Sequence, residues 1–531
     1  MTIAPVRPSA PPPAPPSTRR LSPAALAASL VVAAAVFLVA FDGGSYGLLD
    51  RNSIAIGLWW TIALTVGLGI LPLERVPRAA LLTAVLLAAL AALTLLSALW
   101  ADSVEATLNE FNRVVLYLGV FALVVLASKR LTAPRWSDGI ALGITAVALV
   151  ALASRFLPGL FPGSQLPIFL PTERTRLYYP LNYWNGLAIL VALGAPLLLR
   201  AAVAPGSLVR RAVALAPFPA LAAVIYLTSS RGGTAATVAG VVAFLALTAH
   251  RWAAAGAATL AALGSAGAVV VLLDRHELVN GPLDSAAAEA QGRSAAALVL
   301  LACVLTGALY ALAVRYVPRG IRVGPRVAWA LVAVVALLAL AGVAAADPVQ
   351  RFEEFKRPPE ASLGDDPIRA HLTSASGNGR WQWWAAAVDQ FRSHPLLGDG
   401  AGSYEAWWAR HGTLPGFVRD AHSLYLEMLG ELGLPGFLLV LAIVGSGFFV
   451  GMRRLRRHDP DGRTVTAAFL AGLLAYALAA GVDWMWELTA VSVVGVAFLA
   501  LLTGAATGVP GRRPAARSRV RRRTIGTVPA V

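Results

Sequence analysis

The chain has 531 residues, of which 57% are hydrophobic and only 14% are charged. Soluble proteins are about 45–50% apolar and about 25% charged, so this composition excludes an ordinary soluble domain. The single cysteine, Cys303, has no partner, which excludes a secreted disulfide scaffold. Apolar runs near twenty residues long, the length that crosses a bilayer as a helix, predict a polytopic membrane protein.

In chain order, residues 1–20 are proline-rich and are predicted to form a disordered cytoplasmic tail. A transmembrane bundle of about eleven spans is expected over 21–346, followed by a long polar segment at 347–432. About three further spans are expected within 433–505, and residues 506–531 form a basic cytoplasmic tail. The predicted spans are 24–41, 54–72, 79–99, 113–128, 138–154, 184–199, 212–229, 233–249, 252–273, 295–315, 327–346, 433–451, 465–482 and 488–505.

The net charge of +16 is explained by its distribution over these loops. With the N-terminus inside, the inner segments hold 28 of the 44 basic residues and 4 of the 28 acidic residues. Lys and Arg collect in cytoplasmic loops, so both termini are predicted to be cytoplasmic. The arginines from Arg512 to Arg523 are suited to contact with anionic membrane lipids, and no nucleic-acid binding is expected.

The polar segment 347–432 is predicted to be a large, partly helical extracytoplasmic loop. In its stretch Arg380–Arg392, one helical face carries Trp381, Trp384, Val388 and Phe391. This pattern fits a helix in the membrane interface or a packing helix that covers the bundle. The glycines of Ser393–Tyr404 indicate tight turns, or else a loop whose amides cradle phosphate.

His422 is the histidine with the most distinctive setting. Asp420 is predicted to be an N-cap, which would place His422 in the first turn of a helix that continues into the membrane. The positive end of the helix dipole would keep this histidine neutral, the form that a general base needs. A purely structural histidine at a helix start is the alternative interpretation.

Arginines on the predicted outer face are the expected binding groups for an anion. Arg231 in LTSSRGG begins a tight return into the membrane, where it could snorkel to lipid headgroups or bind a substrate phosphate. Arg174 and Arg176 lie in ERTRLYYPLNYWNG, which is more polar than an aromatic belt requires. Asp483 and Glu487, in a tight outer turn, are reserve functional residues.

The chain has no HExxH motif and no Cys/His cluster, and its Asp-x-Asp sequence at Asp459–Asp461 lies in a predicted cytoplasmic loop, so the sequence predicts neither a metal site nor a cofactor.

Four segments in order resemble the O-antigen ligase and O-antigen polymerase family of bacterial envelope proteins. They are YYPLNYWNGLA, LTSSRGG, GRWQWWAAAVDQFRSHPLLGDGAGSY and DAHSLYLEMLGELGLPG. The resemblance implies a GT-C-like membrane glycosyltransferase of the cytoplasmic membrane, inverting and metal-independent, with its active site on the extracytoplasmic face. It implies a polyprenyl-diphosphate-linked glycan as donor and a hydroxyl of a lipid, glycan or protein as acceptor. In this resemblance His422 corresponds to the family's outer-loop histidine, and Arg231 and Arg380 to its arginines.

Two other classes remain open at the level of sequence. A flippase or exporter of lipid-linked glycan, or another polytopic transporter, would also suit about fourteen spans, although the predicted spans carry few of the ionisable residues that couple transport. A structural scaffold would tolerate replacement of His422 and Arg231. Within the enzyme class, the motifs do not separate a ligase from a polymerase or a protein O-glycosyltransferase.

Overall fold

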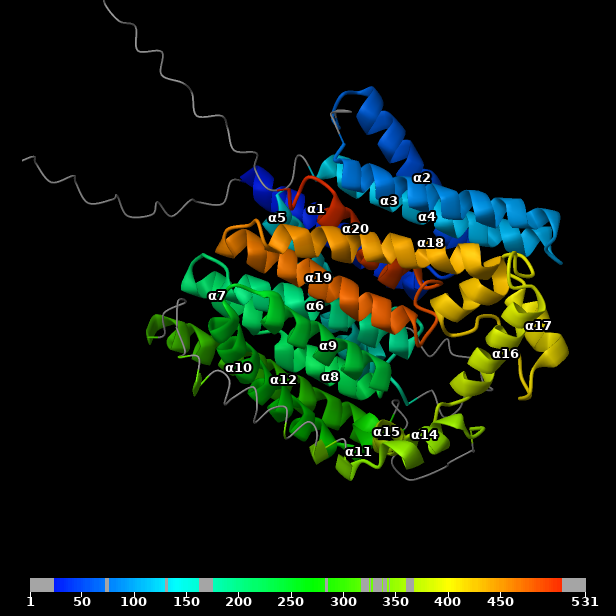
Figure 1. Cartoon of the computed structure of the whole chain (residues 1–531). Helices are drawn as coiled ribbons and strands as arrows, with labels where there is room; N and C mark the ends of the chain where they lie inside the picture. Colours follow the sequence, from blue (N-terminus) through cyan, green and yellow to red (C-terminus); the bar gives the residue numbers. More distant parts are fainter. Residues whose placement is uncertain are drawn as a thin grey trace, which may run out of the picture.

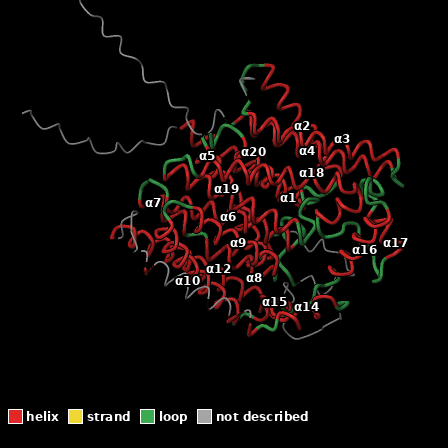
Figure 2. Tube along the Cα trace, viewed as in Figure 1, coloured by secondary structure: helices red, strands yellow, loops and turns green. Residues whose placement is uncertain are grey.

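The computed structural model describes residues 23–71, 76–128, 132–161, 175–281, 285–316, 344–359 and 367–508, together with a few isolated positions between 324 and 342. Within these residues the chain is all-α and contains no strand (Figures 1 and 2). The all-α prediction is therefore confirmed. The helices are α1 (Pro23–Gly44), α2 (Leu48–Gly67), α3 (Arg78–Leu96), α4 (Val104–Ala127), α5 (Ala133–Phe156), α6 (Trp184–Val203), α7 (Leu208–Leu215), α8 (Phe218–Thr228), α9 (Arg231–Leu247), α10 (Arg251–Leu273), α11 (His276–Val279), α12 (Ala286–Tyr316), α14 (Pro348–Lys356), α15 (Pro367–Thr373), α16 (Arg380–Ser393), α17 (Tyr404–His411), α18 (Leu424–Leu455), α19 (Pro460–Ala480) and α20 (Thr489–Thr503), with short 3₁₀ turns at Ser97–Leu99 and Pro158–Leu160.

The predicted spans coincide with helices wherever the structure describes them. In the described ranges, nine helices are long and apolar enough to cross a membrane, and α1, α9 and α20 contain shorter apolar stretches. The predicted span 212–229 consists of two helices, α7 and α8. The span 327–346, the tail 1–20 and most of the tail 506–531 lie outside the described residues. The chain is thus a multi-pass membrane protein, while the total of about fourteen spans and the orientation stay predictions.

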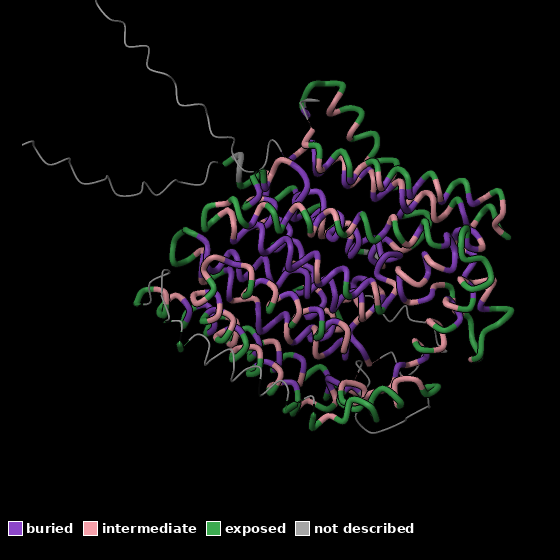
Figure 3. The backbone as a smooth tube through the Cα atoms, viewed as in Figure 1, coloured by how far each residue is buried: buried purple, intermediate pink, exposed green. Residues whose placement is uncertain are grey.

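Helix α6 lies at the centre of the bundle, where the trace is almost entirely buried (Figure 3). Its sequence is largely apolar on every face, as are those of α10 and α12, so its contacts with other helices, and not its composition, distinguish it from helices that face lipid. Helices α9 and α19 pack against it. Helices α10 and α12 lie farther out and expose large apolar side chains such as Leu263 and Leu300, as expected for helices that face lipid.

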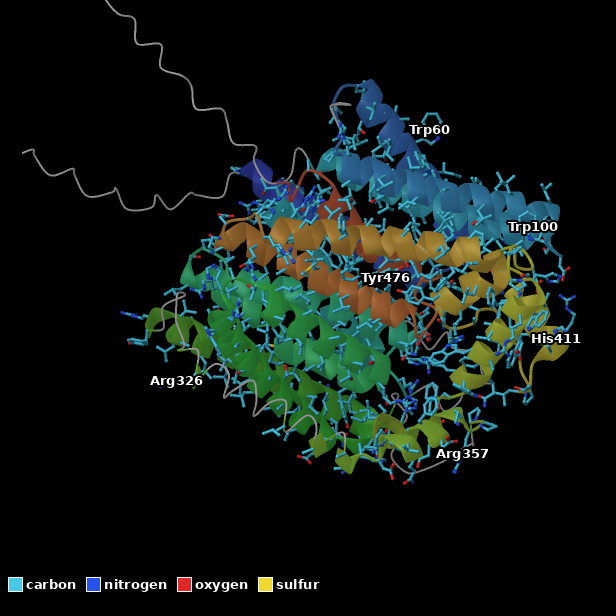
Figure 4. The ribbon with its side chains drawn as sticks, viewed as in Figure 1. Trp60, Trp100, Arg326, Arg357, His411 and Tyr476 are labelled. Atoms are coloured by element: carbon cyan, nitrogen blue, oxygen red, sulfur yellow. The ribbon has the colours of Figure 1, made fainter. Side chains whose placement is uncertain are left out.

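One end of the bundle carries the short helices α14–α17 (Figure 1), which fall within the predicted outer segment 347–432. His411 and Arg357 mark this end in Figure 4, whereas Tyr476 lies inside the bundle. The division into two transmembrane parts and an outer loop stays a prediction.

Helix α18 bends at this end, and the glycine-rich loop before α17 packs against the bend. Gly433 has φ 62°, and a Cβ there would lie 2.6 Å from the carbonyl carbon of Leu396. The loop amides are satisfied by protein: the Gly402 and Tyr404 amides donate to the two carboxylate oxygens of Glu431 at 2.9 and 3.0 Å. The glycines therefore serve tight turns, and the alternative of a phosphate cradle at these two amides is wrong.

Candidate active site

His422 lies in the turn that leads into α18. Ser423 is the N-cap, and its hydroxyl accepts a hydrogen bond from the Leu426 amide. The prediction that Asp420 caps the helix was wrong, because the chain takes a left-handed conformation at His422, with φ 55°, before the helix begins. A left-handed residue other than glycine costs about 1–3 kcal/mol, and such conformations concentrate at functional sites.

The ring of His422 is held in one tautomer. Its Nδ1 lies 3.0 Å from the Asp420 carbonyl oxygen. A carbonyl can only accept, so Nδ1 carries the proton and the lone pair of the neutral ring is on Nε2. Among the described residues, none hydrogen-bonds to Nε2.

The pKa of His422 is lowered to about 4, chiefly by burial and also by Arg380, while Asp483 and the hydrogen bond to Asp420 oppose the shift. The pKa is lowered as the sequence predicted, but burial, which the sequence did not show, is the main cause. At neutral pH the ring is therefore an uncharged base.

Tryptophans from separate elements fix the position of this ring. The ring centroid of Trp383 lies 4.1 Å from that of His422, and the ring of Trp484 meets it edge-on at 6.4 Å. The indole N–H of Trp384 donates to the His422 carbonyl at 3.3 Å. His422 is thus held between α16 and the turn that joins α19 to α20.

Helix α16 is a packing helix, but with a different face from the one predicted. Its buried residues are Ala386, Ala387 and Gln390, and it contacts α18. Trp381, on the predicted apolar face, is 38% exposed. The small alanines allow α16 to approach α18 closely. The predicted face was identified from the larger apolar side chains instead.

Asp483, a reserve residue in the sequence, joins several parts of the site. One of its carboxylate oxygens accepts hydrogen bonds from Arg380 Nη2 at 2.7 Å and from Asn185 Nδ2 at 2.8 Å. The other accepts from the Tyr183 hydroxyl at 2.7 Å and the Trp484 amide at 2.9 Å. Burial would raise the pKa of Asp483, but Arg380, His422 and these hydrogen bonds outweigh burial and lower it, so the carboxylate is ionised.

Arg231 is the first residue of α9, directly after the N-cap Ser230. Its guanidinium donates to the carbonyl oxygens of Ser374 and Ser376. Within the described ranges no carboxylate pairs with it, so these contacts leave its charge uncompensated. Arg176 lies with its guanidinium carbon 5.2 Å from the centre of the Trp184 ring. Arg174 lies outside the described residues.

His371, on α15, shows that the arginines are neighbours. Its pKa is lowered to about 3 by burial and then by the charges of Arg176, Arg231 and Arg380. The fold therefore brings three arginines from distant parts of the chain around one point. His371 could not be singled out from the sequence, because its neighbours come from other segments and no local pattern marks it.

A group of carboxylates, two of them buried, lies beside the Asp420–His422 turn. The sequence marked Glu487 as a reserve functional residue and Asp420 as an N-cap, but it did not show that they meet Glu427. Carboxylate oxygens of Asp420, Glu427 and Glu487 lie within 4.8 Å of one another. Arg113 Nη1 lies 3.9 Å from Glu487 and also pairs with Glu110, so the protein supplies a positive charge beside these acids. Spacing could have shown only that Glu427 and Glu431 share a helix face.

Comparison with known families adds an independent line of support. Residues 285–441 match the family model described as O-antigen ligase. Residues 285–441 are therefore named the O-antigen ligase domain, after the family whose model they match. The resemblance predicted from four sequence segments is thereby confirmed. No curated protein sequence matches the chain.

The O-antigen ligase domain runs from the start of α12 into α18, so it contains Arg380 and His422 but neither Arg231 nor Asp483. The site described above is therefore shared between the O-antigen ligase domain and helices outside it. The family supports a role in membrane glycan assembly of the ligase or polymerase type.

Proposed function

We propose that this protein transfers a glycan from a polyprenyl-diphosphate carrier to an acceptor hydroxyl, on the outer face of the cytoplasmic membrane. The observation that carries the proposal is a neutral histidine with an available Nε2 beside a cluster of arginines. The family match makes glycan assembly the context of that chemistry.

In the proposed step, the acceptor oxygen attacks the anomeric carbon and forms the new glycosidic bond. The bond from that carbon to the phosphate oxygen breaks, and the electron pair leaves with the polyprenyl diphosphate. The acceptor proton passes to Nε2 of His422, whose Nδ1–H stays on the Asp420 carbonyl. A single displacement of this kind inverts the anomeric configuration.

The arginines stabilise the leaving group in this proposal. A departing diphosphate gains negative charge, so fixed cations bind the transition state more tightly than the ground state. Arg231 can do this because its described partners are neutral carbonyls. Arg176 and Arg380 add positive potential around His371, and Arg174 is proposed to join them on the basis of sequence alone. Guanidinium groups supply this charge without a metal ion in the proposed step.

The test is complementation of a strain that lacks the gene. We expect His422→Ala to leave surface glycan absent and to build up polyprenyl-diphosphate-linked glycan on the outer leaflet, measured by mass spectrometry and by access to an external glycosidase. His411→Ala, which changes an exposed histidine on α17, is the matched control and should restore the glycan. Restoration by His422→Ala would refute the transferase. Build-up on the inner leaflet in the deletion strain would favour the flippase.

A further inference from the structure

A cavity of about 510 Å³ lies at the same end of the bundle as His422. Its walls come from the turn before α2, the first turns of α4, the start of α17 and the residues that lead into α18. Sites for small ligands usually have about 300–1,000 Å³, so the cavity is large enough for a sugar. The proposed role of His422 does not use this cavity, which we call the acidic cavity.

The acidic cavity adjoins the His422 site. The side chain of Asp420 lines the cavity, while the carbonyl of the same residue accepts the Nδ1–H of His422. Tyr46, another lining residue, meets Trp484 with ring centroids 5.1 Å apart, and Trp484 in turn meets His422. A second cavity of about 250 Å³ shares Tyr46 and is lined by Tyr183 and Trp484.

Buried polar groups in the acidic cavity have unused hydrogen-bonding capacity. Arg51 and Arg113 line it and are 3% and 4% exposed, yet the Nε atom of each has no hydrogen-bond partner among the described residues. A buried polar group without a partner destabilises the protein, and a charged group does so more strongly. The amide of Asn109 and the phenol of Tyr46 also line the cavity. Guanidinium, amide and carboxylate groups are suited to the hydroxyls of a sugar, which both donate and accept.

The lining of the acidic cavity is less suited to an anionic ligand than to a neutral one. Six acidic residues line it against three arginines. Burial raises the pKa of Asp420, so this group is partly protonated and can itself donate a hydrogen bond to a hydroxyl. A phosphate or carboxylate would add a further negative charge among these acids, whereas the arginine cluster around His371 favours an anion. The two regions therefore favour different kinds of ligand, and Asp420 joins the acidic cavity to His422.

We propose that the acidic cavity binds the sugar that carries the acceptor hydroxyl, and that this sugar is uncharged. The assignment of the sugar as acceptor rests on the proposed transferase. Binding of a neutral saccharide in the cavity can be tested without any transfer reaction.

The test uses the full-length protein in lipid nanodiscs and saturation-transfer-difference NMR. The probes are methyl glycosides of glucose, galactose, mannose and N-acetylglucosamine, with the 6-phosphates of the first three. We expect at least one neutral glycoside to bind at least tenfold more tightly than its phosphate. Asn109→Phe, which fills the cavity, should reduce that signal at least fivefold, whereas Asn52→Phe, on α2 outside the cavity, should keep it.

Further variants separate the binding site from the transfer chemistry. Glu105→Lys, at an exposed lining position, should reduce the ratio of the affinities for the neutral and the phosphorylated sugar at least threefold without affecting folding. His422→Ala should bind the sugar like the wild type. Binding unchanged in Asn109→Phe, equal binding of phosphorylated sugars, or no binding of any neutral glycoside would overturn the proposal. A protein that binds sugar in the cavity but in which His422→Ala restores surface glycan would instead refute only the proposed transferase.

Discussion

Replacing Asp483 by asparagine removes one negative charge from the centre of the site and keeps the shape of the side chain. In the wild type, one carboxylate oxygen accepts from two side-chain donors, Arg380 Nη2 and Asn185 Nδ2. An asparagine that turns its oxygen toward the Tyr183 hydroxyl and the Trp484 amide must place its own NH₂ against these two donors. Arg380 would lose its counter-ion, and Asn185 would keep only the Tyr183 hydroxyl as acceptor.

The size of the effect follows from burial. The side chains of Arg380 and Asp483 are 18% and 7% exposed. Breaking a buried ion pair by removing one partner costs about 3–5 kcal/mol. The partial exposure of Arg380 favours the lower end of this range. Without its partner, Arg380 is no longer held in place. If the transition state thereby loses about 3 kcal/mol of stabilisation, kcat/KM falls roughly 100-fold, since each tenfold step corresponds to about 1.4 kcal/mol.

The assay is glycan transfer in proteoliposomes with a synthetic polyprenyl-diphosphate-linked donor, with the amount of folded protein measured by size-exclusion chromatography. Asp389→Asn is the matched control, because Asp389 pairs with Arg392 on the exposed side of α16. We expect that variant to keep the wild-type rate. Asp483→Asn activity within threefold of wild type would refute the proposed positioning of Arg380 and His422 by this carboxylate.

Two further predictions concern the donor and the base. Arg231→Ala should raise the KM for donor at least tenfold. Arg231→Lys should raise it less, because lysine keeps the positive charge, but it should not restore the wild-type KM, because lysine cannot donate to Ser374 and Ser376 while pairing bidentately with phosphate. Equal effects of the two changes would contradict a phosphate contact. The acidic limb of the kcat/KM profile should lie near pH 4, because the free enzyme loses its neutral base only when the pH falls through the lowered pKa of His422, about 4. A limb near the ordinary histidine value of about 6.5 would show that the ring is not buried in the working enzyme.

The site is formed by residues of the matched domain together with residues outside it. The O-antigen ligase domain supplies His422 and Arg380, while Asp483 belongs to the turn between α19 and α20 and Arg231 to α9. A change in the packing of α9 or α19 would therefore alter the site without altering the residues of the matched domain.

The sequence by itself determined the class of the protein and supplied three candidates for its site. Apolar runs of membrane length do not depend on tertiary context, so the helices could be placed before their packing was known. The choice of His422, Arg231 and Arg380 came from motif order along the chain. The burial of α6 could not be expected in the same way, because a helix that is apolar on every face can be surrounded either by other helices or by lipid.

Only the tertiary structure decided how these residues are arranged. The left-handed turn at His422, its tautomer and its lowered pKa depend on burial under Trp383 and Trp484, which come from other segments. The hydrogen bonds of Asp483 and the setting of His371 join residues that are far apart in the chain. Electrostatic interactions act through space, so their partners cannot be identified from spacing along the sequence. The same reason applies to the acidic cavity, whose walls meet only when α2, α4 and α18 pack together.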